Sequence, residues 1–270
     1  MRIGAPVPDP GDPAAWVAEH KSRGYTAAYF PLNETAADDL VAAYQEAAKA
    51  ADIVIAEVGA WSNPMGPDVR AAQEALALCQ ARLELADRVG ARCCVNISGN
   101  LGEPWDGHHP GNLTPETFDL VVETTRKIID AVKPTRTYYT LEPMPWMFPD
   151  SVDSYERLLA AVDRERFGVH LDPVNIISSP ALYYNTTGLL QECFDRLGPH
   201  IRSCHAKDIR LSQRLTVHLE EVRPGLGVLD YATYLRELDR LPREVPLMIE
   251  HLQTEEDYRA AFEHITSVQW

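Results

Sequence analysis

Four residues that can bind a metal ion or transfer a proton each stand at the end of a short β-rich run. They are Glu142, Asp172, His205 and Glu250. A single residue of this kind more often caps a helix or pairs with a lysine. Four in successive runs are different, because inward-facing residues at the same ends of neighbouring parallel strands point into one volume. The spacing therefore predicts that the four side chains converge.

Three carboxylates in one volume repel one another. Two of them about 4 Å apart cost roughly 4 kcal/mol at an effective dielectric constant of about 20, so three cost on the order of 10 kcal/mol. That is comparable with the stability of a whole domain, about 5–15 kcal/mol. Protonation or a wider separation would relieve the repulsion, but the imidazole of His205 favours a bound cation. Three oxygen donors and one nitrogen suit one divalent ion, Mn²⁺ first, with Mg²⁺, Co²⁺ or Zn²⁺ as alternatives.

The elements that must position these residues alternate along the whole chain. Eight β-rich runs are expected at Arg2–Ala5, Thr26–Phe30, Ile53–Val58, Arg92–Ile97, Thr137–Leu141, Gly168–Leu171, Ile201–His205 and Leu247–His251. Amphipathic helices are expected between them, among them Ala36–Ala50, Val69–Val89, Pro115–Val132, Ser154–Val162, Tyr231–Leu241 and Glu255–Ile265. This alternation predicts an α/β fold, a single (β/α)₈ TIM barrel over residues 1–270, with a doubly wound open sheet as the alternative.

Composition excludes several other classes of protein. The formal net charge of −15 disfavours a nucleic-acid partner, since such binding rests on Lys and Arg. No apolar run approaches the roughly 20 residues of a membrane helix, and no secretory signal begins the sequence, so we expect a cytoplasmic protein without a membrane partner. Five cysteines without a CxxC pair indicate reduced thiols. No G-x-G-x-x-G or P-loop motif indicates a nucleotide site.

The segments around the four residues resemble a known family. Leu-Glu-Pro at 141–143, His-Leu-Asp-Pro-Val-Asn at 170–175, Cys-His-Ala-Lys-Asp at 204–208 and Ile-Glu-His at 249–251 look like the xylose-isomerase-like TIM-barrel sugar (phosphate) isomerase/epimerase family. The resemblance implies that Glu142, Asp172, His205 and Glu250 bind one divalent ion. It also implies that Glu142 and Glu250 are the catalytic acid–base pair.

This resemblance predicts a metal-dependent sugar or cyclitol isomerase or epimerase. A metal ion that stabilises an enediolate acidifies the neighbouring C–H bond, and the two glutamates can remove and return the proton. The alternative is a lyase or dehydratase acting on 3-keto glycosides or inososes, because the same enediolate can expel a β-substituent. A non-catalytic sugar-binding subunit is a further possibility. The expected partner is the small-molecule substrate, with a homo-oligomer or a small partner subunit also possible.

Further residues are candidates for substrate binding. Lys207 and His170 share the inward direction of His205 and Asp172, although an ion pair and a core histidine are equally good interpretations. The loop after the fourth strand offers His108 and His109. The remaining candidates are two possible stacking residues and one amide: Trp61, Trp146 and Asn175.

Two positions depart from the ketose 3-epimerases of the family. Those enzymes usually carry a second glutamate six residues beyond the first metal ligand and a histidine three beyond the aspartate, where this chain has Phe148 and Asn175. The His-His loop and Met144-Pro145-Trp146 look more like family members that cleave oxidised glycosides, including the catalytic subunits of C-glycoside deglycosidases. The departures therefore favour a substrate other than a free ketose.

Overall fold

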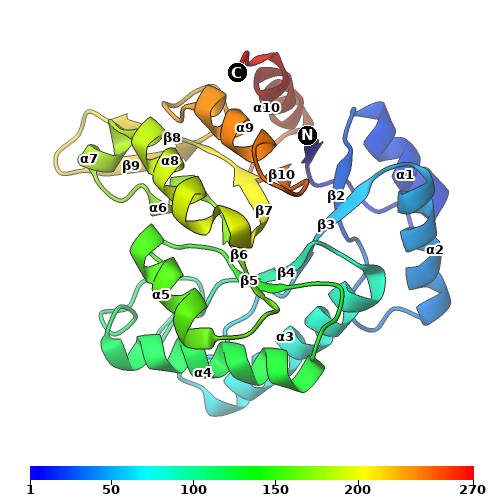
Figure 1. The fold of residues 1–270 in the computed structure, drawn as a ribbon, viewed down its shortest axis with the longest axis horizontal. Helices are drawn as coiled ribbons and strands as arrows, with labels where there is room; N and C mark the ends of the chain where they lie inside the picture. Colours follow the sequence, from blue (N-terminus) through cyan, green and yellow to red (C-terminus); the bar gives the residue numbers. More distant parts are fainter.

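A single barrel of eight parallel strands organises the chain (Figure 1). The computed structural model describes residues 1–270. Around the barrel the strands follow the order β1-β10-β7-β6-β5-β4-β3-β2. Their bounds are β1 Arg2–Gly4, β2 Ala27–Tyr29, β3 Val54–Gly59, β4 Cys93–Asn96, β5 Tyr139–Leu141, β6 Phe167–Leu171, β7 Ile201–Ala206 and β10 Pro246–Ile249. The predicted (β/α)₈ fold is thus confirmed, and each predicted strand overlaps an observed one.

The barrel closes between β1 and β2. The Thr26 amide donates to the Ile3 carbonyl oxygen at 2.9 Å, and the Ile3 amide donates to Thr26 Oγ1 at 3.3 Å. At Gly4 the strands approach so closely that a Cβ atom would overlap the Ala27 carbonyl oxygen. Glycine is therefore required at this position for close backbone approach.

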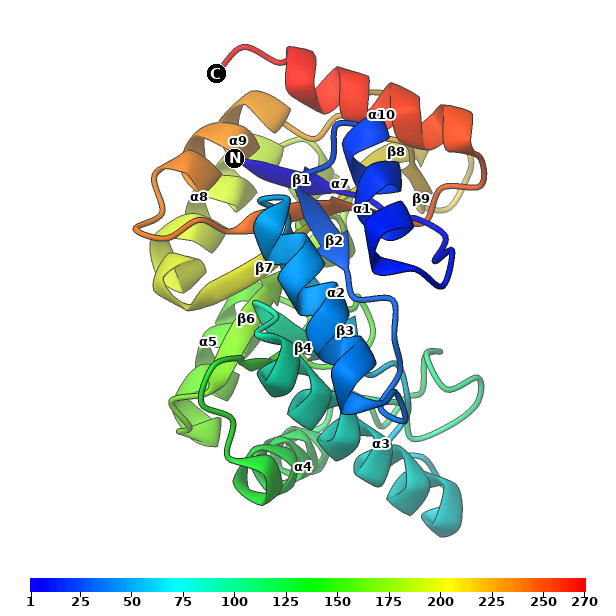
Figure 2. The same ribbon diagram turned by 90° about the vertical axis from the view of Figure 1, so that its right-hand side faces the viewer.

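Helices cover the outside of the barrel, as Figure 2 shows for α1, α2 and α3. The longer ones are α1 Pro13–Ser22, α2 Asp38–Ala50, α3 Val69–Val89, α4 Pro115–Val132, α5 Val152–Val162, α8 Thr186–Leu197, α9 Tyr231–Asp239 and α10 Glu255–Ser267. Side-chain caps fix where several begin: Thr114 accepts from the Thr117 amide, and Asp230 accepts from the Thr233 amide. Buried leucines such as Leu83, Leu158 and Leu190 belong to the apolar core of the domain.

Three small elements were not expected from the sequence. The short helices α6 Pro173–Ile176 and α7 Pro180–Tyr183 follow β6, and an antiparallel hairpin of β8 Asp208–Ser212 and β9 His218–Val222 follows β7. They lie in loops after barrel strands, where the sequence has no hydrophobic periodicity that predicts a helix or a strand. The hairpin carries Glu221 to the mouth of the barrel.

Two predictions from composition can be compared with the structure. All five cysteines are buried and free, as expected for reduced thiols. No helix is both long and apolar enough to cross a membrane.

Candidate active site

Four strands bring the predicted metal ligands together. Glu142, Asp172 and Glu250 come directly after β5, β6 and β10, and His205 lies within β7. Each offers one ligand atom, and these atoms all lie within 4.8 Å of one another. The convergence expected from the sequence is therefore present in the structure.

The Nδ1 atom of His205 faces the three carboxylates. It lies 2.8 Å from Glu250 Oε1, 3.2 Å from Glu142 Oε1 and 3.9 Å from Asp172 Oδ2. Asp172 and His205 have no exposed surface, whereas Glu142 and Glu250 keep 5% and 8%. Only the two glutamates of this set line the adjoining cavity.

Lys207 supplies a positive charge to the same cluster. Its Nζ atom lies 2.8 Å from both Asp172 Oδ2 and Glu250 Oε1, and 3.5 Å from Glu142 Oε1. Burial by itself lowers the pKa of Lys207, but the carboxylates raise it well above its usual value, so the amine is charged. Lys207 thus pairs with these carboxylates, as one interpretation of the sequence expected, and also lines the cavity, as the other did.

Both cavity-facing glutamates are ionised. Burial by itself would raise the pKa of Glu142 and Glu250, but the imidazole of His205 and the ammonium of Lys207 lower it to about 2. At neutral pH both side chains are therefore carboxylates, the form that can bind a cation.

The donor set fits a divalent cation. Asp172 Oδ2 and Glu250 Oε1 are buried and accept no well-aligned hydrogen bond, although the Lys207 ammonium is close to each. Burial lowers the pKa of His205, yet Glu250, Glu142 and Glu57 raise it well above its usual value, so the cluster attracts positive charge. Three carboxylate oxygens and one imidazole nitrogen match the hard, oxygen-rich environment of Mn²⁺ or Mg²⁺.

Glu57 of β3 is a site residue that the sequence analysis missed. It is fully buried, and its Oε1 atom accepts hydrogen bonds from Ser203 Oγ and from His170 Nε2, the latter at 2.9 Å. Its Oε2 atom lies 3.4 Å from His205 Nε2. Burial opposes ionisation of Glu57, but His170 and His205 hold its pKa well below the usual range. A signal existed in the sequence, because a glutamate within the apolar run 53–58 needs a buried partner.

Glu57 therefore faces the imidazole of His205 from the side opposite the carboxylate cluster. If Nε2 carries the proton and donates toward Glu57, the lone pair of Nδ1 is directed at the other three ligands. A carboxylate behind a metal-binding histidine commonly fixes its tautomer in this way. The ring of His170 packs edge-on against His205, with centroids 4.1 Å apart. His170 is thus a core histidine hydrogen-bonded to Glu57.

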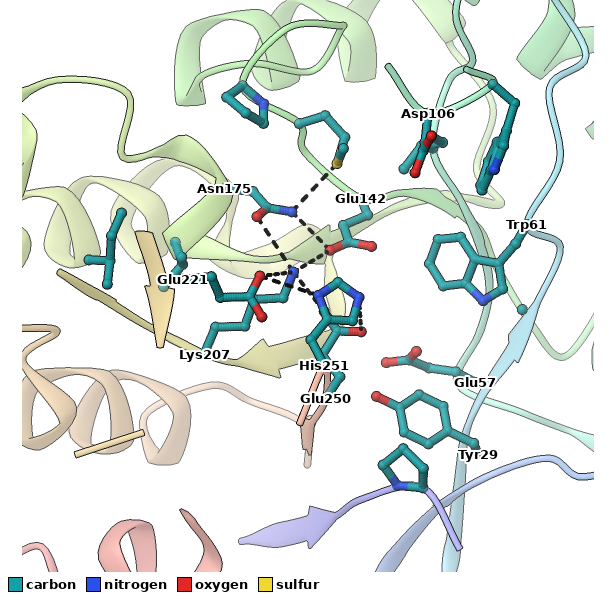
Figure 3. A pocket seen from close by; sticks show the side chains of 18 of the residues that line it. Tyr29, Glu57, Trp61, Asp106, Glu142, Asn175, Lys207, Glu221, Glu250 and His251 are labelled. Atoms are coloured by element: carbon teal, nitrogen blue, oxygen red, sulfur yellow. Dashed lines mark hydrogen bonds and ion pairs between the residues drawn. The ribbon is translucent and has the colours of Figure 1, made fainter. Parts of the chain in front are cut away.

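The cavity above the cluster has a volume of about 1330 Å³ and contains most of the predicted substrate-binding residues. Trp61, Asn175 and Lys207 line it (Figure 3), and so does Trp146. The Nδ2 atom of Asn175 donates to Glu142 Oε1 at 3.1 Å. The amide thus orients one of the two cavity-facing glutamates.

The loop after β4 reaches the cavity through residues other than the predicted histidines. Trp105 and Asp106 line the cavity, whereas His108 and His109 are exposed and lie outside its lining. The Nδ1 atom of His109 instead accepts a hydrogen bond from the Gly111 amide at 3.1 Å. A substrate contact by either histidine stays a prediction.

Three further lining residues had not been singled out from the sequence. Tyr29 lies beside Glu57, and its hydroxyl is buried without a hydrogen-bond partner (Figure 3). His251 and Glu221 form an ion pair at the mouth, with Nδ1 and Oε2 3.2 Å apart. Glu221 belongs to the unexpected hairpin, so its position could not be derived from strand-end spacing.

Comparisons with solved structures show the same fold at low sequence identity. A 3-keto-D-glucoside 4-epimerase from E. coli aligns with a TM-score of 0.68 and 14% identity, over 99% of this chain and 100% of that chain. A probable 3-DHS dehydratase from Bacillus anthracis gives 0.73 and 15%, with both chains fully covered. A xylose isomerase-like TIM barrel protein from Mycobacterium smegmatis, in complex with magnesium, gives 0.66 and 16%, over 94% and 88%. Among curated proteins no match is found.

The family comparison covers nearly the whole chain. The model of the family described as xylose isomerase-like TIM barrel matches residues 15–268. This range includes all four predicted ligands as well as Glu57 and Lys207. The chain therefore belongs to the xylose isomerase-like TIM barrel family.

Proposed function

We propose that this protein is a divalent-metal-dependent isomerase or epimerase of a sugar or cyclitol. The observation that carries the proposal is that two of the four candidate ligands are fully buried and the other two line the cavity. Asp172 and His205 are sealed in the barrel, whereas the ionised Glu142 and Glu250 border the cavity where a substrate would lie. A divalent ion held by these four residues, with Mn²⁺ as first choice and Mg²⁺, Co²⁺ or Zn²⁺ as alternatives, would stabilise negative charge on substrate oxygens.

The two glutamates are placed to move a proton. One carboxylate takes the proton from a hydroxyl-bearing carbon next to a carbonyl, and the electron pair of the broken C–H bond moves into an enediolate. The other glutamate takes up a proton from water and returns it to the opposite face of the same carbon or to the neighbouring carbon, while the first glutamate releases its proton to water. The first outcome is epimerisation and the second is aldose–ketose isomerisation.

Other side chains of the chain would hold the substrate. The Lys207 ammonium can donate to a substrate oxygen, since its Nζ atom lies within 3.5 Å of both glutamates. Asn175 restrains Glu142, and Trp61 and Trp146 offer apolar faces. The four ligands and these cavity residues together form a site of the size and mixed polarity typical of small-molecule enzymes.

A lyase is a second candidate, because two positions differ from a ketose 3-epimerase. Phe148 is buried and packs edge-on against Phe118, with ring centroids 5.3 Å apart, so it adds no acid to the site. Asn175 contacts Glu142 through an amide that cannot titrate. The structural neighbours include both an epimerase of a 3-keto glucoside and a probable dehydratase. A 3-keto glycoside or an inosose is therefore the alternative substrate.

One experiment tests both candidates. The Mn²⁺-loaded protein is incubated in deuterated water with free ketoses, inososes and 3-keto glycosides, and the products are analysed by NMR after removal of the metal. Deuterium incorporation with inversion or carbonyl migration supports the isomerase or epimerase, and release of water or aglycone without inversion supports the lyase. E142Q and E250Q should be inactive, whereas the exposed control E263Q should behave as the wild type. A protein that neither binds metal nor exchanges hydrogen in any substrate would contradict the proposal.

A further inference from the structure

Three partly exposed tryptophans line the cavity beyond the ligand cluster. Trp61, Trp105 and Trp146 keep 43%, 36% and 39% of their surfaces exposed, and all three belong to the cavity wall. Large aromatic side chains gathered in one exposed concavity commonly mark a binding site. They come from the separate loops that follow β3, β4 and β5, so the gathering is a property of the fold.

The cavity is divided into a polar and an aromatic part. In Figure 3, Trp61 and Asp106 lie on the side of the cavity away from Lys207 and Glu221, with Glu142 between the two groups. Its volume of about 1330 Å³ exceeds the roughly 300–1,000 Å³ of pockets that enclose drug-sized ligands. A single sugar ring beside Glu142 and Glu250 would therefore leave the aromatic part unfilled.

The tryptophan of the loop after β5 is held in place by the loop after β4. The Trp146 Nε1 atom donates to the Asp106 carbonyl oxygen at 2.9 Å. The Trp146 carbonyl oxygen accepts from Asn112 Nδ2 at 3.2 Å, and Asn112 is fully buried. The indole is thus fixed before any ligand arrives.

Trp61 is restrained by a different set of contacts. Its indole lies so close to Gly59 that a Cβ atom there would overlap Trp61 Nε1. The backbone of Ser62, the residue after Trp61, is held by the buried Asn96. The Asn96 side chain accepts from the Ser62 amide at 3.2 Å and donates to the Ser62 carbonyl oxygen at 3.1 Å. The indoles of Trp61 and Trp146 are therefore preorganised, which lowers the entropy cost of stacking a ligand on them.

We propose that the aromatic part of the cavity is a subsite for the second ring of a glycoside. The first ring lies at Glu142 and Glu250, and the second ring, either an aromatic aglycone or another sugar, stacks on Trp61, Trp105 and Trp146. Both kinds of ring present a flat apolar face to an indole. This inference rests on the proposed function, because the two glutamates place the first ring.

The test compares ligands that differ only in the second ring. Dissociation constants are measured by calorimetry for methyl β-D-glucoside, phenyl β-D-glucoside and cellobiose with the Mn²⁺-loaded protein. We expect phenyl glucoside or cellobiose to bind at least about tenfold more tightly than the methyl glucoside, and the tighter of the two shows whether the subsite prefers an aromatic ring or a sugar ring. W61A and W146A should each weaken that ligand by about 2- to 12-fold, a larger loss than either variant causes for the methyl glucoside. W270A, which removes an exposed tryptophan outside the cavity, is the matched control.

Hydrogen exchange of the corresponding 3-keto compounds in deuterated water separates this inference from the proposed function. A preference for the second ring without exchange supports the subsite and contradicts the proposed chemistry. Exchange without such a preference supports the chemistry and overturns the subsite. Equal binding of the three ligands, no detectable binding of any, or a preference that survives in the W61A/W146A double variant overturns it as well.

Discussion

Glu57 Oε2 lies 3.4 Å from His205 Nε2, at the edge of the imidazole ring opposite the nitrogen that faces Glu142, Asp172 and Glu250. The same ring thus faces carboxylates through both nitrogens, because its Nδ1 atom lies 2.8 Å from Glu250 Oε1 and 3.2 Å from Glu142 Oε1. The atoms of the first contact are in ion-pair range without a well-aligned hydrogen bond, and the second contact belongs to the candidate metal site. We infer that Glu57 is a positioning residue, whose charge favours a proton on His205 Nε2.

The variant E57Q should weaken binding of Mn²⁺ by about 10- to 100-fold, because the neutral amide no longer favours the Nε2–H tautomer of His205. Binding is measured by the EPR signal of free Mn²⁺, and the absorption spectrum of a Co²⁺-loaded sample reports the ligand geometry. E263Q, which alters an exposed glutamate, is the control. Wild-type affinity in E57Q would show that Glu57 only fills the barrel.

Metal binding should also stabilise the fold. At a free concentration of 100 times the dissociation constant, a ligand of the native state adds about 2.7 kcal/mol to the free energy of unfolding. For a protein of this size we expect Tm to rise by roughly 5–10 °C on addition of Mn²⁺ and to fall again with a chelator. In D172N, which removes a fully buried carboxylate of the cluster, the rise should disappear. An unchanged rise in D172N would exclude Asp172 as a ligand.

Tyr29 offers a buried hydroxyl without a hydrogen-bond partner at the cavity wall. If this hydroxyl binds substrate, Y29F should raise KM by about 2- to 12-fold, corresponding to one hydrogen bond, without lowering Tm. Y44F is the matched control. The Tyr44 hydroxyl donates a hydrogen bond of 2.6 Å to Asp9, and Tyr44 does not line the cavity. Y44F should lower stability by about 1 kcal/mol and leave KM unchanged. The same KM in Y29F and the wild type would rule out this contact.

His20 should make the stability of the protein depend on pH. Burial lowers its pKa below 6.5, although the hydrogen bond to the Trp16 carbonyl oxygen partly opposes the shift. Below pH 6.5 the unfolded chain binds a proton that the folded chain excludes. The free energy of unfolding should therefore fall by up to about 1.4 kcal/mol per pH unit as the pH decreases from 6.5 toward the folded pKa. Urea unfolding at several pH values, compared between the wild type and H20N, isolates this contribution. Parallel pH profiles would contradict it.

Strand-end spacing was sufficient to predict the ligand cluster, because the position of each strand end follows from local sequence and all eight ends meet at one mouth. In this way Glu142, Asp172, His205 and Glu250 could be predicted to converge. The partners of Glu57 could not, since the contact with His205 spans the interior of the barrel and depends on strand register and tilt. The Glu221–His251 pair depends on an irregular hairpin, and the paths of the loops decide that Trp105 rather than His109 reaches the cavity.

The strand order also links the site to the synthesis of the chain. Among the barrel strands, β1 precedes and β10 follows all the others in the sequence, and the two pair, so the barrel remains open until residues 246–249 have left the ribosome. Glu250, the last of the four candidate ligands, emerges directly after them. A nascent chain thus gains its closing strand and its final ligand at the same moment, and a metal ion in the cell would meet a complete site only on a chain that can also close its barrel.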